Sequence, residues 1–150
     1  MESRRVFYAE ANYGQEEIDA VVDVLENQRH ALVTGPKCIE FEKIVAKEYN
    51  KKFGLMSNSG SSANLLAIQA ANLPKGSEVI TPALTFSTTV APLIQSGLIP
   101  VFVDIELETL QASLEEIEGS INENTSAIMI PNLIGNLIDW EALSSIAKNN

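Results

Sequence analysis

The sequence predicts an α/β domain built on a mainly parallel sheet with helices on both faces. After Asn50, short apolar runs alternate with helical segments, and strands separated by helices are joined as parallel strands by crossovers. The composition of the 150 residues, 45% hydrophobic and 20% charged, is typical of a globular domain with a buried core. Together these observations favour the α/β class over a disordered or fibrous chain.

Residues 1–52 are expected to form an N-terminal helical segment. Apolar residues recur at helical spacing in residues 15–28, and acidic residues occupy the first turn, where the helix dipole favours them. A loop at residues 34–36 follows, and Pro36 suits the first turn of a second helix. The buried face of this second helix is expected to comprise four side chains: Phe41, Ile44, Val45 and Tyr49.

Residues 53–150 are expected to form the first part of a larger, truncated α/β domain. Strands are predicted at residues 53–57, 78–81, 100–104 and 127–131. Helices are predicted at residues 61–72, 87–96 and 113–121, and from Asp139 onward. Ser113 and Glu116 have the spacing of a capping box. The sequence stops where another strand is expected, so we expect the sheet to lack its remaining members.

Charge and cysteine content disfavour several classes of protein. The net charge of −10 repels nucleic acid and anionic membranes, so a bound phosphate needs local donors such as the N–H groups of a helix N-terminus. One cysteine, Cys38, and one histidine, His30, cannot make a closed metal site. No apolar run reaches the ~18 residues of a membrane span, and the N-terminus does not resemble a signal peptide. We therefore expect a cytoplasmic protein.

The loops that follow the predicted strands are the candidate binding positions. In open α/β sheets, ligands bind beyond the carboxyl ends of the strands, here at residues 57–62, 81–87, 104–111 and 131–139. The first loop places Gly60 and Ser61 among small residues at the start of a helix, which suits an anion. An ordinary strand-to-helix turn with a serine N-cap explains the same spacing equally well.

The other loops carry weaker signals. Phe86 lies at a strand end and could cover a planar ring, although a lone Phe is more often part of a core. Asp104 and the acidic residues after it are expected to be solvated rather than metal-binding. Asn132 and Asn136 flank Gly135 and either bind a ligand or cap the turn, and capping is slightly favoured.

Several segments, taken together and in order, resemble one family. They are NSGSSANL at residues 58–65, FSTT at 86–89, and VFVDI at 101–105 with ETL at 108–110. They are similar to the DegT-type family of pyridoxal-phosphate-dependent aminotransferases and dehydratases that act on nucleotide-linked keto sugars. SGSSANLL, STT and NLIGN at 132–136 look more like the sugar 3-dehydratases. The resemblance implies the N-terminal part of an aspartate-aminotransferase-type (fold type I) large domain.

The resemblance also implies roles for individual residues. By position, Gly60 and Ser61 would bind the phosphate of pyridoxal 5'-phosphate or pyridoxamine 5'-phosphate, and Phe86 would stack on the pyridine ring. Thr34 corresponds to a loop near the sugar site. The Schiff-base position, a lysine in the aminotransferases and a histidine in the 3-dehydratases, is expected beyond Asn150. No catalytic residue is therefore assigned here, and the chain alone is expected to be inactive.

Three functional hypotheses remain open. The first is the N-terminal part of a 4-keto-6-deoxysugar 3-dehydratase with a nucleotide-linked keto sugar as substrate, working as a homodimer. The second is part of a sugar aminotransferase. The third belongs to another class, a non-catalytic module that binds a phosphorylated ligand or serves in assembly. The residue at the Schiff-base position would separate the first two.

Overall fold

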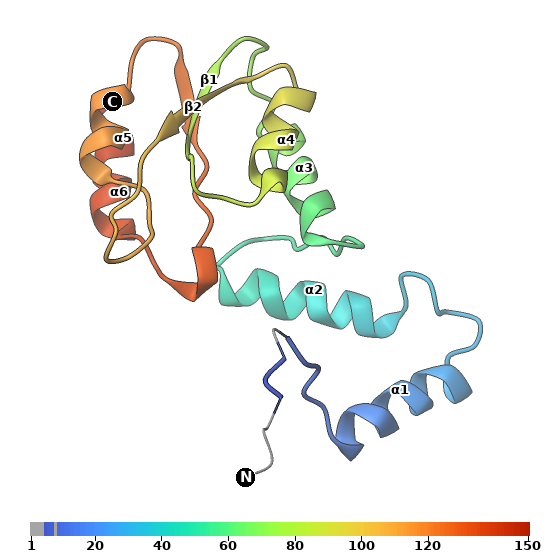
Figure 1. The fold of residues 1–150 in the computed structure, drawn as a ribbon. Helices are drawn as coiled ribbons and strands as arrows, with labels where there is room; N and C mark the ends of the chain where they lie inside the picture. Colours follow the sequence, from blue (N-terminus) through green and yellow to red (C-terminus); the bar gives the residue numbers. More distant parts are fainter. Residues whose placement is uncertain (1–4, 8) are drawn as a thin grey trace. The chain divides into compact units, whose positions relative to one another are not determined.

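The computed structural model describes residues 5–7 and 9–150. The chain divides into two compact units, residues 1–56 and residues 57–150. Figure 1 labels helices and strands of both units.

The first unit contains two helices, α1 (Gln15–Asn27) and α2 (Pro36–Glu48), which confirms both predicted helices. The N–H of Gly14 donates to the Glu17 carboxylate (2.7 Å), so this side chain caps the start of α1. Pro36 occupies the first turn of α2, where its missing N–H costs nothing. The residue before it must be small, because a Cβ on Gly35 would collide with the carbonyl oxygen of Ala31.

The predicted buried face of α2 is wrong at three of its four positions, and Val45 is half-buried. Phe41, Ile44 and Tyr49 are exposed, and Ala46 is the buried residue of the helix. Helix α1 likewise buries none of its residues, although its apolar side chains share one face as the spacing predicted. Helical periodicity determines which side chains lie together, but burial requires a partner, and the described residues of this unit do not supply one.

The strand predicted at residues 53–57 is also absent from the described structure. Phe53 and Leu55 are exposed, and the N–H of Met56 donates to the Glu42 carboxylate (2.8 Å) rather than to a neighbouring strand. A strand is stable only beside a hydrogen-bonded neighbour, and no other strand pairs with this segment here. The β-type pattern therefore remains an extended segment.

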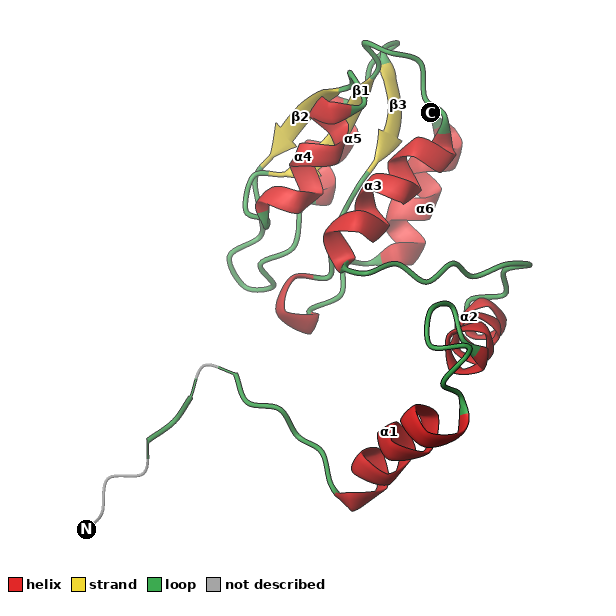
Figure 2. Ribbon diagram, turned by 90° about the vertical axis from the view of Figure 1, so that its right-hand side faces the viewer, coloured by secondary structure: helices red, strands yellow, loops and turns green. Residues whose placement is uncertain are grey.

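The second unit is a three-stranded parallel sheet flanked by helices, which confirms the α/β class. The sheet has the order β2-β1-β3 and comprises β1 (Glu78–Pro82), β2 (Ile99–Val103) and β3 (Thr125–Ile128). The helices are α3 (Gly60–Ala71), α4 (Ser87–Gln95), α5 (Leu114–Ser120) and α6 (Trp140–Asn149), with a 3-10 turn, η1 (Leu133–Gly135). Figures 1 and 2 show α3 and α4 on one face of the sheet and α5 and α6 on the other.

Alternate residues of the central strand β1 pack into two hydrophobic cores, one on each face of the sheet. Val79 is fully buried against Ile68 of α3 and Leu93 of α4. Ile80 is fully buried on the opposite face, in a cluster whose helical members are Ile117 of α5 and Leu143 of α6. This period-two division places the carboxyl end of β1 between the two helical layers.

Two local predictions in this unit need correction. Ser113 is the N-cap of α5 but makes no side-chain capping bond, and Glu116 instead accepts the N–H of Asp104 (2.6 Å). The predicted capping box is therefore wrong, because the carboxylate binds the end of β2 rather than its own helix. The last strand lies at Thr125–Ile128 instead of residues 127–131, although the Met129 N–H still donates to the Ile80 carbonyl (2.8 Å).

Candidate functional site

The loop before α3 is ordered by its own serines. Ser59 is the N-cap: its Oγ accepts the N–H of Ser62 (3.1 Å), and its carbonyl accepts the N–H of Ala63 (3.0 Å). The Ser57 hydroxyl donates to the same Ser59 carbonyl (2.9 Å). These bonds fix the first turn of the helix without a charged side chain, which agrees with the serine N-cap interpretation.

Capping still leaves two donors available. Within the described part of the chain, the N–H groups of Gly60 and Ser61 meet no acceptor, and the first N–H groups of a helix have no intrahelical partner. A Cβ built on Gly60 would meet nothing within 4 Å, so the space beside this residue is open. These two N–H groups, the candidate anion cradle, lie at the positive end of a helix, which suits an anion such as a phosphate.

Phe86 lies at the N-cap of α4, in the loop that follows β1. Its backbone carbonyl accepts the N–H of Thr89 (2.9 Å), and the Thr85 hydroxyl donates to the Thr89 hydroxyl (2.8 Å), so the turn is held in place. The Phe86 side chain is 70% exposed, which excludes the interpretation of a core residue in this chain. An exposed ring on an ordered turn is available to stack on a planar ligand.

The structure connects the two helices that carry these groups. The Asn64 side-chain amide of α3 donates to the backbone carbonyl of Thr88 in α4 (3.1 Å). A hollow of about 210 Å³ lies between the helices, with Ser61, Thr88 and Pro92 among its lining residues. The helix that carries Gly60 is thus bonded to the helix that carries Phe86, a connection that no local sequence pattern predicts.

The loop after β3 is tied to the loop after β2. The Asn136 side-chain amide donates to the Thr109 carbonyl (2.6 Å), and Asn132 makes no side-chain capping bond. The expectation that these amides cap their own turn is therefore wrong for both residues. Between them, Ile134 has a φ of 50°, a strained conformation for a β-branched residue, with its side chain exposed. Such outliers concentrate at functional sites, and no sequence signal identified this one.

Thr34 belongs to the first unit, where it also has a positive φ, of 54°. It is exposed, like Ile134, and is β-branched. Both loops that the sequence singled out for a sugar-binding or ligand-binding role therefore contain one β-branched residue in the left-handed region.

The acidic residues after β2 form no metal site. Asp104 is exposed and accepts the N–H of Ile105 (2.8 Å). Across residues 5–7 and 9–150, no group of His, Cys, Asp and Glu side chains is arranged to hold a metal ion. In the same residues, none of the helices has the length and apolar character needed to cross a bilayer.

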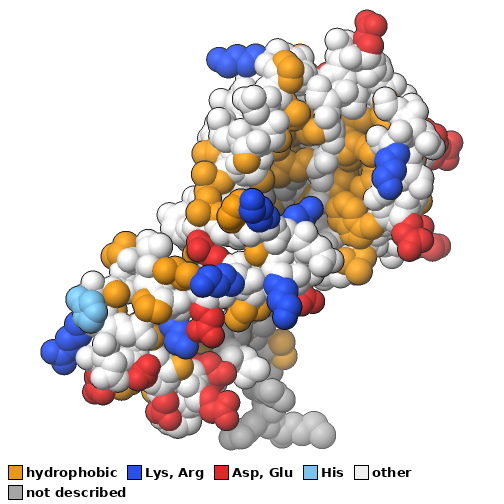
Figure 3. Space-filling view, turned by 180° about the vertical axis from the view of Figure 1, so that it is seen from behind, with side chains coloured by type: hydrophobic (Ala, Val, Ile, Leu, Met, Phe, Trp, Pro, Cys, Tyr) orange, Lys and Arg blue, Asp and Glu red, His pale blue; other side chains and the backbone are white. Residues whose placement is uncertain are grey.

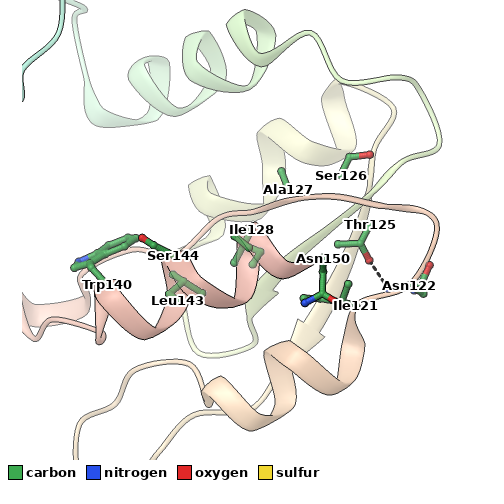
Figure 4. A pocket seen from close by; sticks show the side chains of 11 residues that line it. Ile121, Asn122, Thr125, Ser126, Ala127, Ile128, Trp140, Leu143, Ser144 and Asn150 are labelled. Carbon is green, nitrogen blue, oxygen red and sulfur yellow. Dashed lines mark hydrogen bonds between the residues drawn. The ribbon is translucent and has the colours of Figure 1, made fainter.

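A larger cavity lies away from the cradle, beside the outer edge of β3. It has a volume of about 480 Å³, and Ile121, Ile128, Trp140 and Leu143 are among the residues that line it. Figure 3 shows hydrophobic side chains gathered in a hollow of the second unit. Figure 4 shows Ile128 and Leu143 in the wall and the bond from the Asn122 N–H to the Thr125 hydroxyl (3.0 Å) at one end. The cavity is mainly apolar, and none of its lining side chains is ionisable.

Comparison with known proteins identifies relatives over nearly the whole chain. A family model described as the DegT/DnrJ/EryC1/StrS aminotransferase family matches residues 11–150. The GDP-4-keto-6-deoxy-D-mannose 3-dehydratase of Yersinia pseudotuberculosis is 36% identical over 146 residues, which cover 93% of this chain and 37% of the relative. The dTDP-4-dehydro-2,6-dideoxy-D-glucose 3-dehydratase of Saccharopolyspora spinosa is 38% identical over 148 residues, covering 87% of this chain and 32% of the relative.

A solved structure shows the same architecture. The E. coli GDP-4-keto-6-deoxy-D-mannose-3-dehydratase, crystallised with bound hydrated PLP, superposes with a TM-score of 0.86 at 34% identity. The match covers 95% of this chain and 38% of the crystallised one. The present chain thus spans about a third of the length of these relatives.

Proposed function

The chain belongs to the DegT/DnrJ/EryC1/StrS aminotransferase family, and from this premise we propose that it is the N-terminal part of a cofactor-dependent enzyme of deoxysugar biosynthesis. The proposed cofactor is pyridoxal 5'-phosphate or pyridoxamine 5'-phosphate, and the proposed substrate is a nucleotide-linked keto sugar. The favoured reaction is the 3-dehydration of a 4-keto-6-deoxysugar.

One observation carries the cofactor proposal: the free N–H groups of Gly60 and Ser61 and the exposed ring of Phe86 lie on bonded helices. The two N–H groups suit a phosphate, and the phenyl ring suits the face of a pyridine ring. When bound, the cofactor supplies an electron sink for the sugar chemistry. The residues of this chain hold and orient it.

The reaction type is argued from the relatives. Two similar enzymes are named sugar 3-dehydratases, which supports dehydration. The description of the family as aminotransferases keeps amino transfer as the second candidate. A histidine at the Schiff-base position of the complete protein would support the first and a lysine the second. A non-catalytic phosphate-binding module is the candidate from another class.

We further propose that residues 53–150 are the first part of a larger cofactor-binding domain. The outer edge of β2 is less suited to pairing, because the Ile99 N–H faces β1 and Pro100, on the outward side, has no N–H to donate. The β3 edge is open. The Met129 N–H faces β1, so alternation turns the backbone N–H groups of Ile128 and Ile130 away from β1, toward the open edge.

The proposed occupant of the open β3 edge is a further parallel strand of the same polypeptide. The apolar cavity beside Ile128 and Leu143 would receive its side chains. The greater length of the relatives supports this arrangement. We also propose a cytoplasmic homodimer, which would give the exposed apolar faces of α1 and α2 a partner.

The phosphate cradle is tested with a single N–H removed. Gly60→Pro deletes one N–H at the first helical position, where proline is tolerated, and the extended backbone of Ser59 (φ −164°, ψ 159°) is compatible with a following proline. A hydrogen bond to a charged group contributes about 1.5–3 kcal/mol, so we expect the complete protein to bind pyridoxal 5'-phosphate about tenfold or more weakly.

Gly60→Ala is the matched control, because it adds a methyl group in open space and keeps the N–H. Equal dissociation constants for Gly60→Pro and Gly60→Ala, measured by cofactor absorbance, would refute the cradle. The reaction type is measured separately by mass spectrometry of the product from a nucleotide-linked 4-keto-6-deoxysugar. A 3-deoxy product supports the dehydratase, an amino sugar supports the aminotransferase, and no turnover supports the non-catalytic module.

A further inference from the structure

Two side-chain hydrogen bonds hold α3 against α4. Near the start of the pair, the Asn64 amide donates to the Thr88 carbonyl (3.1 Å). Near the other end, the Gln69 amide donates to the Ser96 hydroxyl (2.8 Å). Both bonds advance in the same direction along the two helices, so α3 and α4 run parallel and their N-termini lie at the same end. The groups of the proposed cofactor site are at that end.

The acceptor of the Asn64 bond is a carbonyl that lacks its usual helical donor. In a regular α-helix, the Thr88 carbonyl would accept the N–H of residue 92. Residue 92 is a proline inside α4, and proline has no N–H. The Asn64 amide replaces that donor from the neighbouring helix, in a partly buried position where an unpaired carbonyl is costly.

The distances along the chain link this bond to the cradle. Asn64 lies one helical turn after Gly60, and Thr88 lies two residues after Phe86. A bond between them therefore fixes the start of α3, with its free N–H groups, relative to the start of α4, with its exposed ring. The Gln69–Ser96 bond joins the far ends of the helices, so it does not fix the ends that carry the free N–H groups and the ring.

We propose that Asn64 is a positioning residue, which uses the carbonyl freed by Pro92 to set the spacing between the phosphate cradle and the Phe86 ring. This inference rests on the proposed function. Asn64 does not itself touch the cofactor in this proposal. It acts through Gly60 and Ser61 on one side and through Phe86 on the other.

A purely structural role would be the satisfaction of the Thr88 carbonyl alone, and Pro92→Ala separates the two roles. Alanine supplies the missing N–H to Thr88 from within α4. Because a carbonyl oxygen has two lone pairs, Pro92→Ala alone leaves room for the Asn64 bond. In the Asn64→Ala/Pro92→Ala double variant, the carbonyl is satisfied but the link between the helices is lost.

The experiment measures two quantities in the complete protein: the dissociation constant for pyridoxal 5'-phosphate and the urea midpoint of unfolding. We expect Asn64→Ala to lower the midpoint and weaken binding about three- to tenfold, with a smaller circular-dichroism band of the bound cofactor. The double variant should recover the midpoint but keep the weakened binding. Gln69→Ala should lower the midpoint without changing the dissociation constant.

The outcomes distinguish the inference from the proposed function. Recovery of cofactor affinity in the double variant would overturn the positioning role, and so would equal affinities for Asn64→Ala and Gln69→Ala. Failure of the unaltered protein to bind pyridoxal 5'-phosphate would overturn the proposed function together with the inference. A second cycle checks the route: in a Phe86→Ala background, Asn64→Ala should weaken binding less than twofold, because its partner ring is gone. An undiminished effect there would exclude action through Phe86.

Discussion

In both units the apolar residues follow the spacing of their helix or strand, but the two units differ in how far these residues are buried. In the second unit, Ile80 is fully buried at the centre of a sheet covered on both faces. In the first unit, Ile44 lies on the apolar face of α2 and is 57% exposed. Both residues fit the spacing of their elements. The difference shows that spacing specifies a face, whereas burial depends on what the fold places against that face.

The largest expected effect tests this comparison directly. Ile80→Ala removes a fully buried side chain from the central strand and should lower the free energy of unfolding of the chain by about 2–5 kcal/mol. Ile44→Ala should change the free energy of unfolding by no more than about 0.5 kcal/mol, as substitutions at other exposed sites do. Urea unfolding monitored by circular dichroism measures both. Similar losses at the two positions would mean that α2 has a covered face in solution.

A smaller effect is expected at a helix cap of the second unit. Asp139 accepts the N–H groups of Glu141 and Ala142 (3.1 and 2.9 Å) at the start of α6, which is anchored by buried Leu143. Asp139→Ala should lower the free energy of unfolding by about 1 kcal/mol. Ser113→Ala is the control, because Ser113 makes no capping bond, and it should cost a few tenths of that. Equal losses in urea unfolding would contradict this distinction between the caps.

The next prediction concerns exposed aromatic residues in the two units. Phe86→Ala should weaken cofactor retention by the complete protein, since stacking contributes about 0.5–1.5 kcal/mol, or roughly two- to tenfold in the dissociation constant. Phe41→Ala removes an exposed ring from the first unit and should leave that constant unchanged. Spectrophotometric titration measures both variants. An unchanged constant for Phe86→Ala would exclude it as the ring cover.

The smallest effect is local to α1. The Gly14 N–H that donates to the carboxylate lowers the pKa of Glu17 below its ordinary value. The pKa of Glu17 is lower in the folded state than in the unfolded state. The stabilisation of the fold by the Gly14–Glu17 bond is therefore present above the unfolded pKa and is lost as pH falls through the folded pKa. An NMR titration of the Glu17 side chain and the Gly14 amide should show it. Glu17→Gln should remove the response of the amide, and a pKa at or above the ordinary value would contradict the bond.

Much of the fold was predictable because its signals are local. The apolar spacing from Gln15, the proline at residue 36 and the alternation of strands and helices after Asn50 all depend on residues close in sequence. The same holds for the serine-capped turn around Gly60. A cap or a period needs no distant partner, so these predictions agree with the structure.

The remaining features depend on partners that are distant in sequence. The strand predicted at residues 53–57 fails because pairing needs another strand, and Glu116 leaves its predicted cap for the N–H of Asp104. Asn64 and its carbonyl acceptor are separated by 24 positions. No periodicity links such residues, and only the packing of α3 on α4 reveals that Pro92 frees the acceptor.

The parallel arrangement of α3 and α4 has a consequence for the rate at which the proposed site would capture a phosphate ester. Two helix N-termini at one end produce a local positive potential, whereas the chain as a whole carries a net charge of −10. The net negative charge repels a phosphate over a longer range, and salt screens this repulsion beyond about 8 Å at physiological ionic strength. The helix N-termini attract the phosphate only at short range, where salt screens little. We therefore expect a phosphate ester to associate faster with this chain as salt is added. Attractive electrostatic steering would give the opposite salt dependence.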